Sequence, residues 1–153
     1  MVKLIRTDST NLDFHLLVKF LDKDLAQKNG DKNDFFQQFN QLDFIQNVVL
    51  LYVEDGAVAC GAYKKLDHTT VEIKRMYTLP EARKKGYAQQ ILNELMQWAT
   101  EEQYTNAVLE TGQKMKEAIR LYKAFGFEII PNYPPYEKEE TSRCFRITLM
   151  NGK

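Results

Sequence analysis

The chain has 153 residues, of which 44% are hydrophobic, so it is long enough to bury the core of an ordinary domain. Its 21 basic and 21 acidic residues cancel, which excludes recruitment of nucleic acid or an anionic membrane by net charge. The sequence contains no run of about 18 apolar residues and no signal peptide, and Cys60 and Cys144 are too few for a disulfide framework or a zinc site. We therefore expect a single domain over residues 1–153 in the reducing cytoplasm, with no bound metal.

The start of the chain predicts a strand followed by a helix. Residues 2–6 are short and apolar enough for the strand. Ser9, Thr10 or Asn11 can cap the helix, because their side-chain oxygens accept hydrogen bonds from backbone N–H groups, and Asn29-Gly30 can end it. Residues at helical spacing form its inner face: Phe14, Leu17, Val18, Leu21 and Leu25.

A second, shorter helix is expected from Asp34 to Leu42. It carries three phenylalanines, Phe35, Phe36 and Phe39. Large aromatic residues so close together are either core residues or part of the wall of an acceptor pocket.

Three strands should follow as an antiparallel meander. Residues 47–54 and 57–66 are joined by Asp55-Gly56, a pair that typically forms a hairpin turn. Asp67-His68 makes a second tight connection into residues 70–79. This third strand is therefore expected inside the sheet.

The second half of the chain alternates helices and strands. Residues 86–102 are expected to form a helix, and residues 107–111 a strand parallel to residues 70–79, because a helix connects the two strands. The stripe of the first helix is Ala88, Ile91, Leu92, Leu95, Met96 and Ala99. The stripe of the next helix, which Gly126 ends, is Met115, Ala118, Leu121, Tyr122 and Phe125. The closing strands are residues 127–130 and 144–149, on either side of an irregular segment.

A basic turn, Arg83-Lys84-Lys85-Gly86-Tyr87-Ala88, joins the third strand of the meander to the helix. The first N–H groups of a helix have no intrahelical partner, and the helix dipole favours negative charge. Gly86 has no Cβ, so an anion can approach the backbone and positive φ is allowed. Arg83 can bind a phosphate through two nitrogens. The turn predicts a pyrophosphate site, and a solvated basic turn is the alternative.

Three pieces of the sequence, in this order and spacing, resemble the Gcn5-related N-acetyltransferases (GNAT). Residues 72–88 resemble the family's central strand and its R/Q-x-x-G-x-G/A loop. Leu109-Glu-Thr-Gly112 resembles the next strand, and Leu121-Tyr-Lys-Ala-Phe-Gly-Phe127 the L-Y-x-x-x-G-F end of a helix. The resemblance implies an α/β fold with a mixed, mostly antiparallel sheet of about six to seven strands and about four helices.

The resemblance also implies which residues bind acetyl-CoA. The strands at residues 70–79 and 107–111 should splay apart, so that the amides of the cofactor pair with the backbone of Met76, Tyr77 and Thr78. The residues implied in pyrophosphate binding are Arg83, Lys84, Lys85, Gly86, Tyr87, Ala88 and Gln89. The sequence departs from the family at Met115, where many relatives have Asn or Gln, and at Ala88, where glycine is commonest.

Tyr122 is the candidate catalytic acid. A phenol, with a pKa of about 10, can protonate a leaving thiolate that lies in hydrogen-bonding reach. Helical periodicity alone also allows a core tyrosine. The L-Y-x-x-x-G-F match favours the catalytic role.

Glu72 is the candidate base. It precedes Arg83 by eleven positions, the offset of the catalytic glutamate in histone-acetylating members of the family. Strand alternation places Glu72 on one face with Met76 and Thr78, and Arg75 and Tyr77 on the other. An exposed strand acid is the alternative, because many relatives deprotonate the amine through water chains.

The segment Pro131 to Arg143 is the candidate acceptor site. Tyr133 and Tyr136 lie among prolines, with Glu137, Glu139 and Glu140 nearby, and such an acidic, aromatic rim suits a cationic amine. The pattern resembles a subgroup of small bacterial GNAT proteins, and the candidate contacts are Asn132, Tyr133 and Tyr136. A solvated surface loop is the alternative.

The predicted function is transfer of an acetyl group from acetyl-CoA to a primary amine of a small molecule, peptide or protein. Neither cysteine has a neighbouring histidine in sequence, so direct attack in a ternary complex is expected. The alternative is a sensor or regulatory module that binds acyl-CoA without turnover. No nucleic-acid or membrane partner is expected, and the resemblance allows a homodimer.

Overall fold

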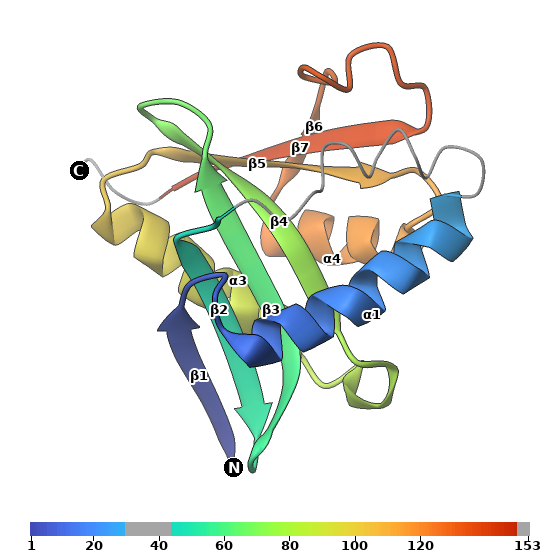
Figure 1. Cartoon of the computed structure of the whole chain (residues 1–153). Helices are drawn as coiled ribbons and strands as arrows, with labels where there is room; N and C mark the ends of the chain where they lie inside the picture. The colour runs from blue at the N-terminus through green and yellow to red at the C-terminus, as the bar shows by residue number, and fades with distance from the viewer. Residues whose placement is uncertain (30–43, 150–153) are drawn as a thin grey trace. The chain divides into compact units, whose positions relative to one another are not determined.

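The computed structural model describes residues 1–29 and 44–149. Seven strands are hydrogen-bonded in the order β1-β2-β3-β4-β5-β7-β6 (Figure 1). The strands are β1 Val2–Thr7, β2 Asn47–Val53, β3 Gly56–Lys65, β4 Thr70–Thr78, β5 Asn106–Gly112, β6 Glu128–Ile130 and β7 Ser142–Thr148. The helices are α1 Leu12–Asn29, the 3-10 helix η2 Pro80–Ala82, α3 Tyr87–Glu101 and α4 Lys116–Phe125.

The predicted mixed α/β fold is confirmed. β4 and β5 run parallel, as expected from their helical connection, while β1 with β2, β2 with β3, β5 with β7 and β6 with β7 are antiparallel. Within the two described ranges there are three α-helices instead of about four, and the helix expected from Asp34 to Leu42 lies outside them. None of the described helices is both long enough and apolar enough to cross a membrane.

The chain divides into two compact units. The first unit consists of residues 1–64 and 74–95, and the second of residues 65–73 and 96–153. Strand β4 contributes to both, because the division falls after Ile73.

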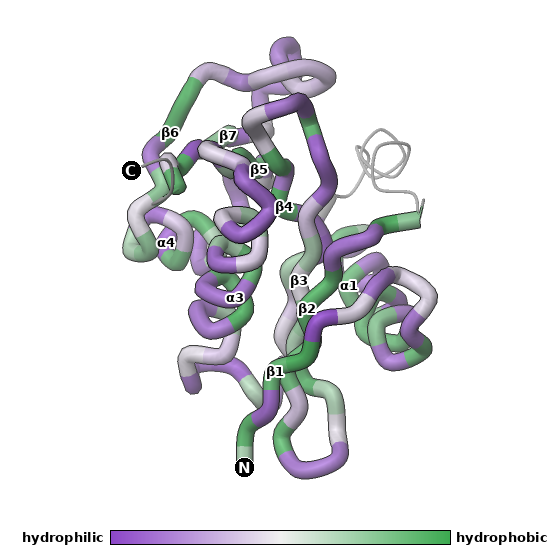
Figure 2. Tube along the Cα trace, turned by 90° about the vertical axis from the view of Figure 1, so that its left-hand side faces the viewer, coloured by the Kyte–Doolittle hydropathy of each residue, from purple (hydrophilic) through white to green (hydrophobic). Residues whose placement is uncertain are grey.

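In the first unit, α1 lies across one face of β2 and β3 (Figure 1). Asn11 is its cap, because its Oδ1 accepts hydrogen bonds from the backbone N–H groups of Asp13 at 2.8 Å and Phe14 at 3.2 Å. Hydrophobic and hydrophilic residues alternate along its turns (Figure 2), so that one side is buried. The core residues on this face are Phe14, Leu17, Val18, Ile45, Val48, Leu50, Cys60 and Ala62.

Gly61 faces the opposite side of β3, because side chains alternate along a strand and its neighbours Cys60 and Ala62 face α1. A Cβ added to Gly61 would lie 2.5 Å from Met76 Sδ, 2.6 Å from Ile91 Cγ2 and 3.0 Å from Leu95 Cδ1. Glycine therefore allows the first half of α3 to pack closely on β3.

We expect Gly61→Ala to lower the free energy of unfolding by about 2 kcal/mol, because the added methyl group overpacks this contact. Urea denaturation measures the effect. Gly56→Ala is the matched control, because its Cβ would have no neighbour nearer than 3.9 Å, so its midpoint should stay close to the wild-type value. Equal midpoints for the two variants would contradict the close packing of α3 on β3.

The hairpin between β2 and β3 is present, but its predicted turn residues are wrong by one position. Val53 pairs with Gly56, so the turn consists of Glu54 and Asp55, and Gly56 belongs to the strand. Glu54 takes the positive φ of 55°. The register of the two strands, which a dipeptide pattern does not encode, decides this.

In the second unit, α4 packs on β7. The Tyr122 ring lies 5.7 Å from that of Phe127 and 6.5 Å from that of Phe145, measured between centroids. The predicted stripe of α4 is only partly correct, because Tyr122 is its one fully buried member and Met115 precedes the helix as its cap. Gly126 ends the helix with a φ of 120°, as the sequence predicts.

Candidate functional site

The turn between η2 and α3 in the first unit has a backbone suited to an anion. Lys84 and Gly86 have positive φ, 65° and 81°, while Lys85 between them does not. Such alternation turns successive N–H groups toward the same side. A Cβ added to Gly86 would meet no atom within 4 Å, so the space beside it is open. The first turn of α3, beginning at Tyr87, adds further N–H groups without intrahelical partners.

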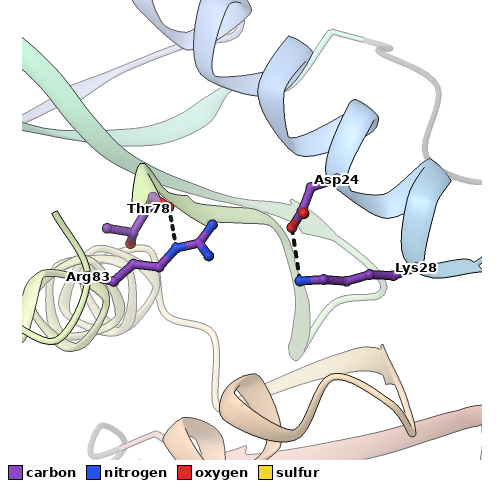
Figure 3. A network of polar contacts seen from close by, with 4 residues as sticks. All are labelled: Asp24, Lys28, Thr78 and Arg83. Atoms are coloured by element: carbon purple, nitrogen blue, oxygen red, sulfur yellow. Dashed lines mark hydrogen bonds and ion pairs between the residues drawn. The ribbon is translucent and has the colours of Figure 1, made fainter. Parts of the chain in front are cut away.

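Arg83 is anchored to the end of β4 (Figure 3). Its Nε donates a hydrogen bond to the Thr78 carbonyl at 2.9 Å, and its guanidinium lies 5.5 Å from the centroid of the Tyr77 ring. The same view shows Lys28 paired with Asp24 of α1 at 3.1 Å. The guanidinium of Arg83 thus lies between the end of β4 and the Tyr77 ring, and a guanidinium can bind a phosphate through two nitrogens.

The predicted cofactor positions on β4 alternate between two faces, as expected. Met76 lies on the α3 side, next to Gly61, and Tyr77 packs against the core below α1. The positive φ of Arg75, 60°, was not predicted. It interrupts the regular strand just before these positions, and the Arg75 carbonyl accepts a hydrogen bond from the Cys60 thiol at 3.2 Å. The residues around it, Lys74-Arg75-Met76, contain no glycine, asparagine or aspartate, so the local sequence gives no signal for this conformation.

Arg75 itself is a buried cation. Its side chain is 4% exposed, and Nη1 forms an ion pair with Asp22 Oδ1 of α1 at 2.7 Å. Strand alternation predicts on which face of β4 Arg75 lies. It does not predict the ion pair with Asp22, because the two residues are 53 positions apart in sequence. Arg75 therefore links the C-terminal half of β4 to α1.

In the second unit, Glu72 belongs to a polar face of the sheet. Glu72 pairs with Val108, and Glu110, two residues further along β5, pairs with Cys144. Cross-strand partners share a face, so the two carboxylates lie on the same side of the sheet. Tyr133 donates a hydrogen bond to Glu72 Oε2 at 2.8 Å, and the buried Ser142 donates one to Glu110 Oε2 at 2.7 Å.

The sequence pattern predicts no role for Glu110, although the residue lies in the segment Leu109-Glu-Thr-Gly112. Its position next to Glu72 depends on the parallel register of β4 and β5. A strand pattern predicts which residues share a face within one strand, but not which residues of two strands lie opposite each other.

The segment between β6 and β7 folds on itself. Asn132 Nδ2 lies 3.2 Å from the carbonyl of Tyr136, and 3.1 Å from the carbonyls of both Glu139 and Ser142. Tyr136 is only 2% exposed, and its ring meets that of Tyr133 edge-on at 5.9 Å. The alternative prediction, a surface loop solvated along its whole length, is therefore wrong. One member of the predicted acidic rim, Glu139, is engaged within the loop itself, because its Oε1 accepts a hydrogen bond from Thr141 Oγ1 at 2.9 Å.

Burial and the two carboxylates raise the pKa of the groups that face them. Burial is the largest cause of the raised pKa of both Tyr133 and Tyr136. The charge and hydrogen bond of Glu72 add to it for Tyr133, and the charges of Glu110 and Glu72 add to it for Tyr136. Burial likewise raises the pKa of Cys144 to about 11 and that of Cys60 to about 12. Both tyrosines therefore remain hydrogen-bond donors at neutral pH, and both cysteines remain thiols.

Tyr122 reaches the sheet from the other face, because it packs on Phe145, the neighbour of Cys144 in β7. The residue is 6% exposed, and its hydroxyl has no hydrogen-bond partner within residues 1–29 and 44–149. Burial raises its pKa, and the charge of Glu110 raises it further. Most buried hydroxyls are paired, whereas this one, within the described part of the chain, is available to a bound ligand.

Tyr122 and Glu72, the two predicted catalytic residues, thus lie on opposite faces of the second unit's sheet. Over the described ranges, no group of three or more His, Cys, Asp or Glu side chains could hold a metal ion.

Comparisons with known proteins found a matching family and similar sequences. The model of the Acetyltransferase (GNAT) family matches residues 15–127. An uncharacterized N-acetyltransferase of Bacillus subtilis, YsnE, is 34% identical over 90 residues, which cover 58% of this chain and 60% of the relative. The uncharacterized N-acetyltransferase YjgM of Escherichia coli is 42% identical over 59 residues, 39% of this chain and 35% of the relative. The matches thus span less than two thirds of these relatives.

Solved structures match over almost the full chain. A candidate acyl-CoA N-acyltransferase from Klebsiella pneumoniae superposes with a TM-score of 0.80 and 25% identity, covering 97% of this chain and 98% of the other. A GNAT family acetyltransferase from Elizabethkingia anophelis, with acetyl-CoA bound, has a TM-score of 0.69 and 18% identity over 97% of this chain and 98% of that one. At that identity the second likeness concerns the fold alone.

Proposed function

The chain belongs to the GNAT family of acetyltransferases, and on this premise we propose that residues 1–153 form one domain that transfers an acetyl group from acetyl-CoA to a primary amine. The observation that carries the proposal is the turn from Arg83 to Gly86, with its alternating φ values and the open space beside Gly86. A pyrophosphate needs backbone N–H groups and a bidentate cation at one point, and this turn supplies both.

The residues proposed to hold acetyl-CoA follow from the same geometry. Backbone N–H groups of Lys84, Lys85, Gly86, Tyr87, Ala88 and Gln89 would bind the pyrophosphate together with Arg83. The backbone of Met76, Tyr77 and Thr78 would pair with the amides of the cofactor. Bound acetyl-CoA supplies the acetyl group as an activated thioester.

Glu72 and Tyr122 would divide the proton transfers. Glu72 takes a proton from the ammonium group of the acceptor, which frees the nitrogen lone pair for attack. Tyr122 would hold a proton for the leaving group and donate it to the thiolate. Direct attack is supported by the raised pKa values of Cys60 and Cys144, since a thiol is a poor nucleophile.

The acceptor is proposed to be a cationic small molecule or an amino group of a peptide or protein. Glu72 and Glu110 put negative charge on one face, and Tyr133 and Tyr136 add aromatic rings. We place the protein in the cytoplasm and allow for a homodimer, as is frequent in the family, without a nucleic-acid or membrane partner.

The test combines thermal unfolding with thiol release. Acetyl-CoA at about 100 times its dissociation constant should stabilise the fold by about 2.7 kcal/mol. In the same samples, free thiol should appear when a panel of amino acids, polyamines and lysine peptides is added, above the rate of acetyl-CoA hydrolysis. Stabilisation without release on any amine would favour the alternative, an acyl-CoA sensor.

Two variants of Gly86 make the binding test specific. Asn and Asp both tolerate positive φ and have the same shape, but only Asp adds a negative charge. We expect Gly86→Asp to abolish the shift of the melting temperature with acetyl-CoA, and Gly86→Asn to retain most of it, because the pyrophosphate is repelled only by the carboxylate. Equal shifts for both variants would contradict a pyrophosphate at this turn.

A further inference from the structure

The hydrogen bond between Tyr133 and Glu72 has a fixed direction. Tyr133 donates to Glu72 Oε2 at 2.8 Å, and burial together with the charge of Glu72 raises the pKa of the phenol. The phenol therefore stays protonated over the physiological pH range, and the carboxylate oxygen is always the acceptor. Such a charge-assisted bond is stronger than a neutral one and restricts the orientation of the carboxylate.

Tyr133 is held in place by its own loop. Asn132 gathers three backbone carbonyls, those of Tyr136, Glu139 and Ser142, around its amide nitrogen. Tyr136 is buried, its N–H donates to the Tyr133 carbonyl at 2.7 Å, and its ring packs against that of Tyr133. The loop between β6 and β7 is therefore an ordered support for one phenol hydroxyl.

We propose that Tyr133 is a positioning residue for Glu72, and that Asn132 acts through it by holding the loop. This inference rests on the proposed function, in which Glu72 accepts the proton of the acceptor. It differs from the sequence-based prediction, in which Asn132 and Tyr133 contact the acceptor directly. The amide nitrogen of Asn132 and the hydroxyl of Tyr133 are both engaged within the protein, which favours support over recognition.

The two roles differ in the kinetic constant that they change. Loss of an acceptor contact raises KM for the acceptor, whereas loss of orientation at the base lowers kcat. We expect Tyr133→Phe to lower kcat about ten-fold and to change both KM values by less than about two-fold, because a slightly misplaced base still works at reduced rate. The assay measures thiol release from acetyl-CoA with the panel amine that reacts fastest.

A double-mutant cycle tests whether Tyr133 acts through Glu72. In the Glu72→Gln background, Tyr133→Phe should change kcat by less than about two-fold, because no base remains to be oriented. Tyr52→Phe is the matched control, since it removes another phenol–carboxylate hydrogen bond, to Asp13 in the first unit, and should leave kcat unchanged. Melting temperatures show whether each variant is folded.

The outcomes separate the inference from its premise. A ten-fold loss in both backgrounds, or a raised acceptor KM at unchanged kcat, would overturn the positioning role and leave Glu72 as the base. If Glu72→Gln by itself had no effect on kcat, the base would be wrong, and the positioning role would fall with it.

Discussion

Replacing Tyr122 with phenylalanine is expected to lower kcat about 100-fold, because the leaving thiolate loses its proton donor. The affinity for acetyl-CoA should hardly change, because the contacts proposed for its pyrophosphate and amides do not involve the Tyr122 hydroxyl. Single-turnover thiol release measures the chemical step, and the acetyl-CoA dependence of the melting temperature measures binding. A loss in kcat and kcat/KM together would indicate an interaction made in the transition state.

The stability of the same variant is its internal control. The Tyr122 ring packs against Phe127 and Phe145, and phenylalanine preserves both contacts. Because the hydroxyl has no hydrogen-bond partner within the described residues, its removal should leave the melting temperature unchanged or slightly higher. An unchanged kcat would exclude the acid role, and a lower melting temperature would reveal a structural one.

Much of the fold follows from short-range patterns in the sequence. Helical spacing identifies the buried face of α1, and four of its five predicted inner residues are buried, Phe14, Leu17, Val18 and Leu21. The parallel pairing of β4 with β5 follows from the helix between them. These predictions succeed because each depends only on the residues of one element or on the connection that follows it.

The failures concern features that two elements decide together. The hairpin turn is displaced from Asp55-Gly56 to Glu54-Asp55 by the register of β2 and β3. The positive φ of Arg75 accompanies an ion pair with Asp22 of α1, far away in sequence. No window of neighbouring residues contains this information.

In the candidate site, too, local features follow from the sequence, whereas contacts between distant residues do not. The turn at Gly86 was predictable because its residues are consecutive and each has a local reason. The bond from Tyr133 to Glu72 joins residues 61 positions apart, and the sequence predicted the two residues separately, for different roles. Composition suggested an acidic rim at Glu137, Glu139 and Glu140, whereas the carboxylate beside Glu72 is Glu110 of β5.

The second large effect is expected for Glu72→Gln, which should lower kcat about 100-fold at neutral pH because the acceptor ammonium loses its proton acceptor. Glutamine has nearly the same shape, and its side-chain oxygen can still accept the hydrogen bond from Tyr133, so the loop should remain in place. Glu110→Gln is the matched control, because it removes an equal charge from the same face of the sheet. Its kcat should fall by less than about five-fold if only Glu72 takes the proton.

The pH dependence of the Glu72→Gln variant distinguishes a lost base from a damaged site. Without the carboxylate, the reaction depends on amine that is already neutral in solution, and this fraction grows about ten-fold per pH unit below the amine pKa of about 10.4. The variant should therefore recover rate steadily between pH 7 and pH 9. The rate of the wild type should rise less if Glu72 deprotonates the bound ammonium, as proposed. A variant that stays equally slow at high pH has lost more than a base, and one with the wild-type rate at pH 7 shows that water, not Glu72, removes the proton.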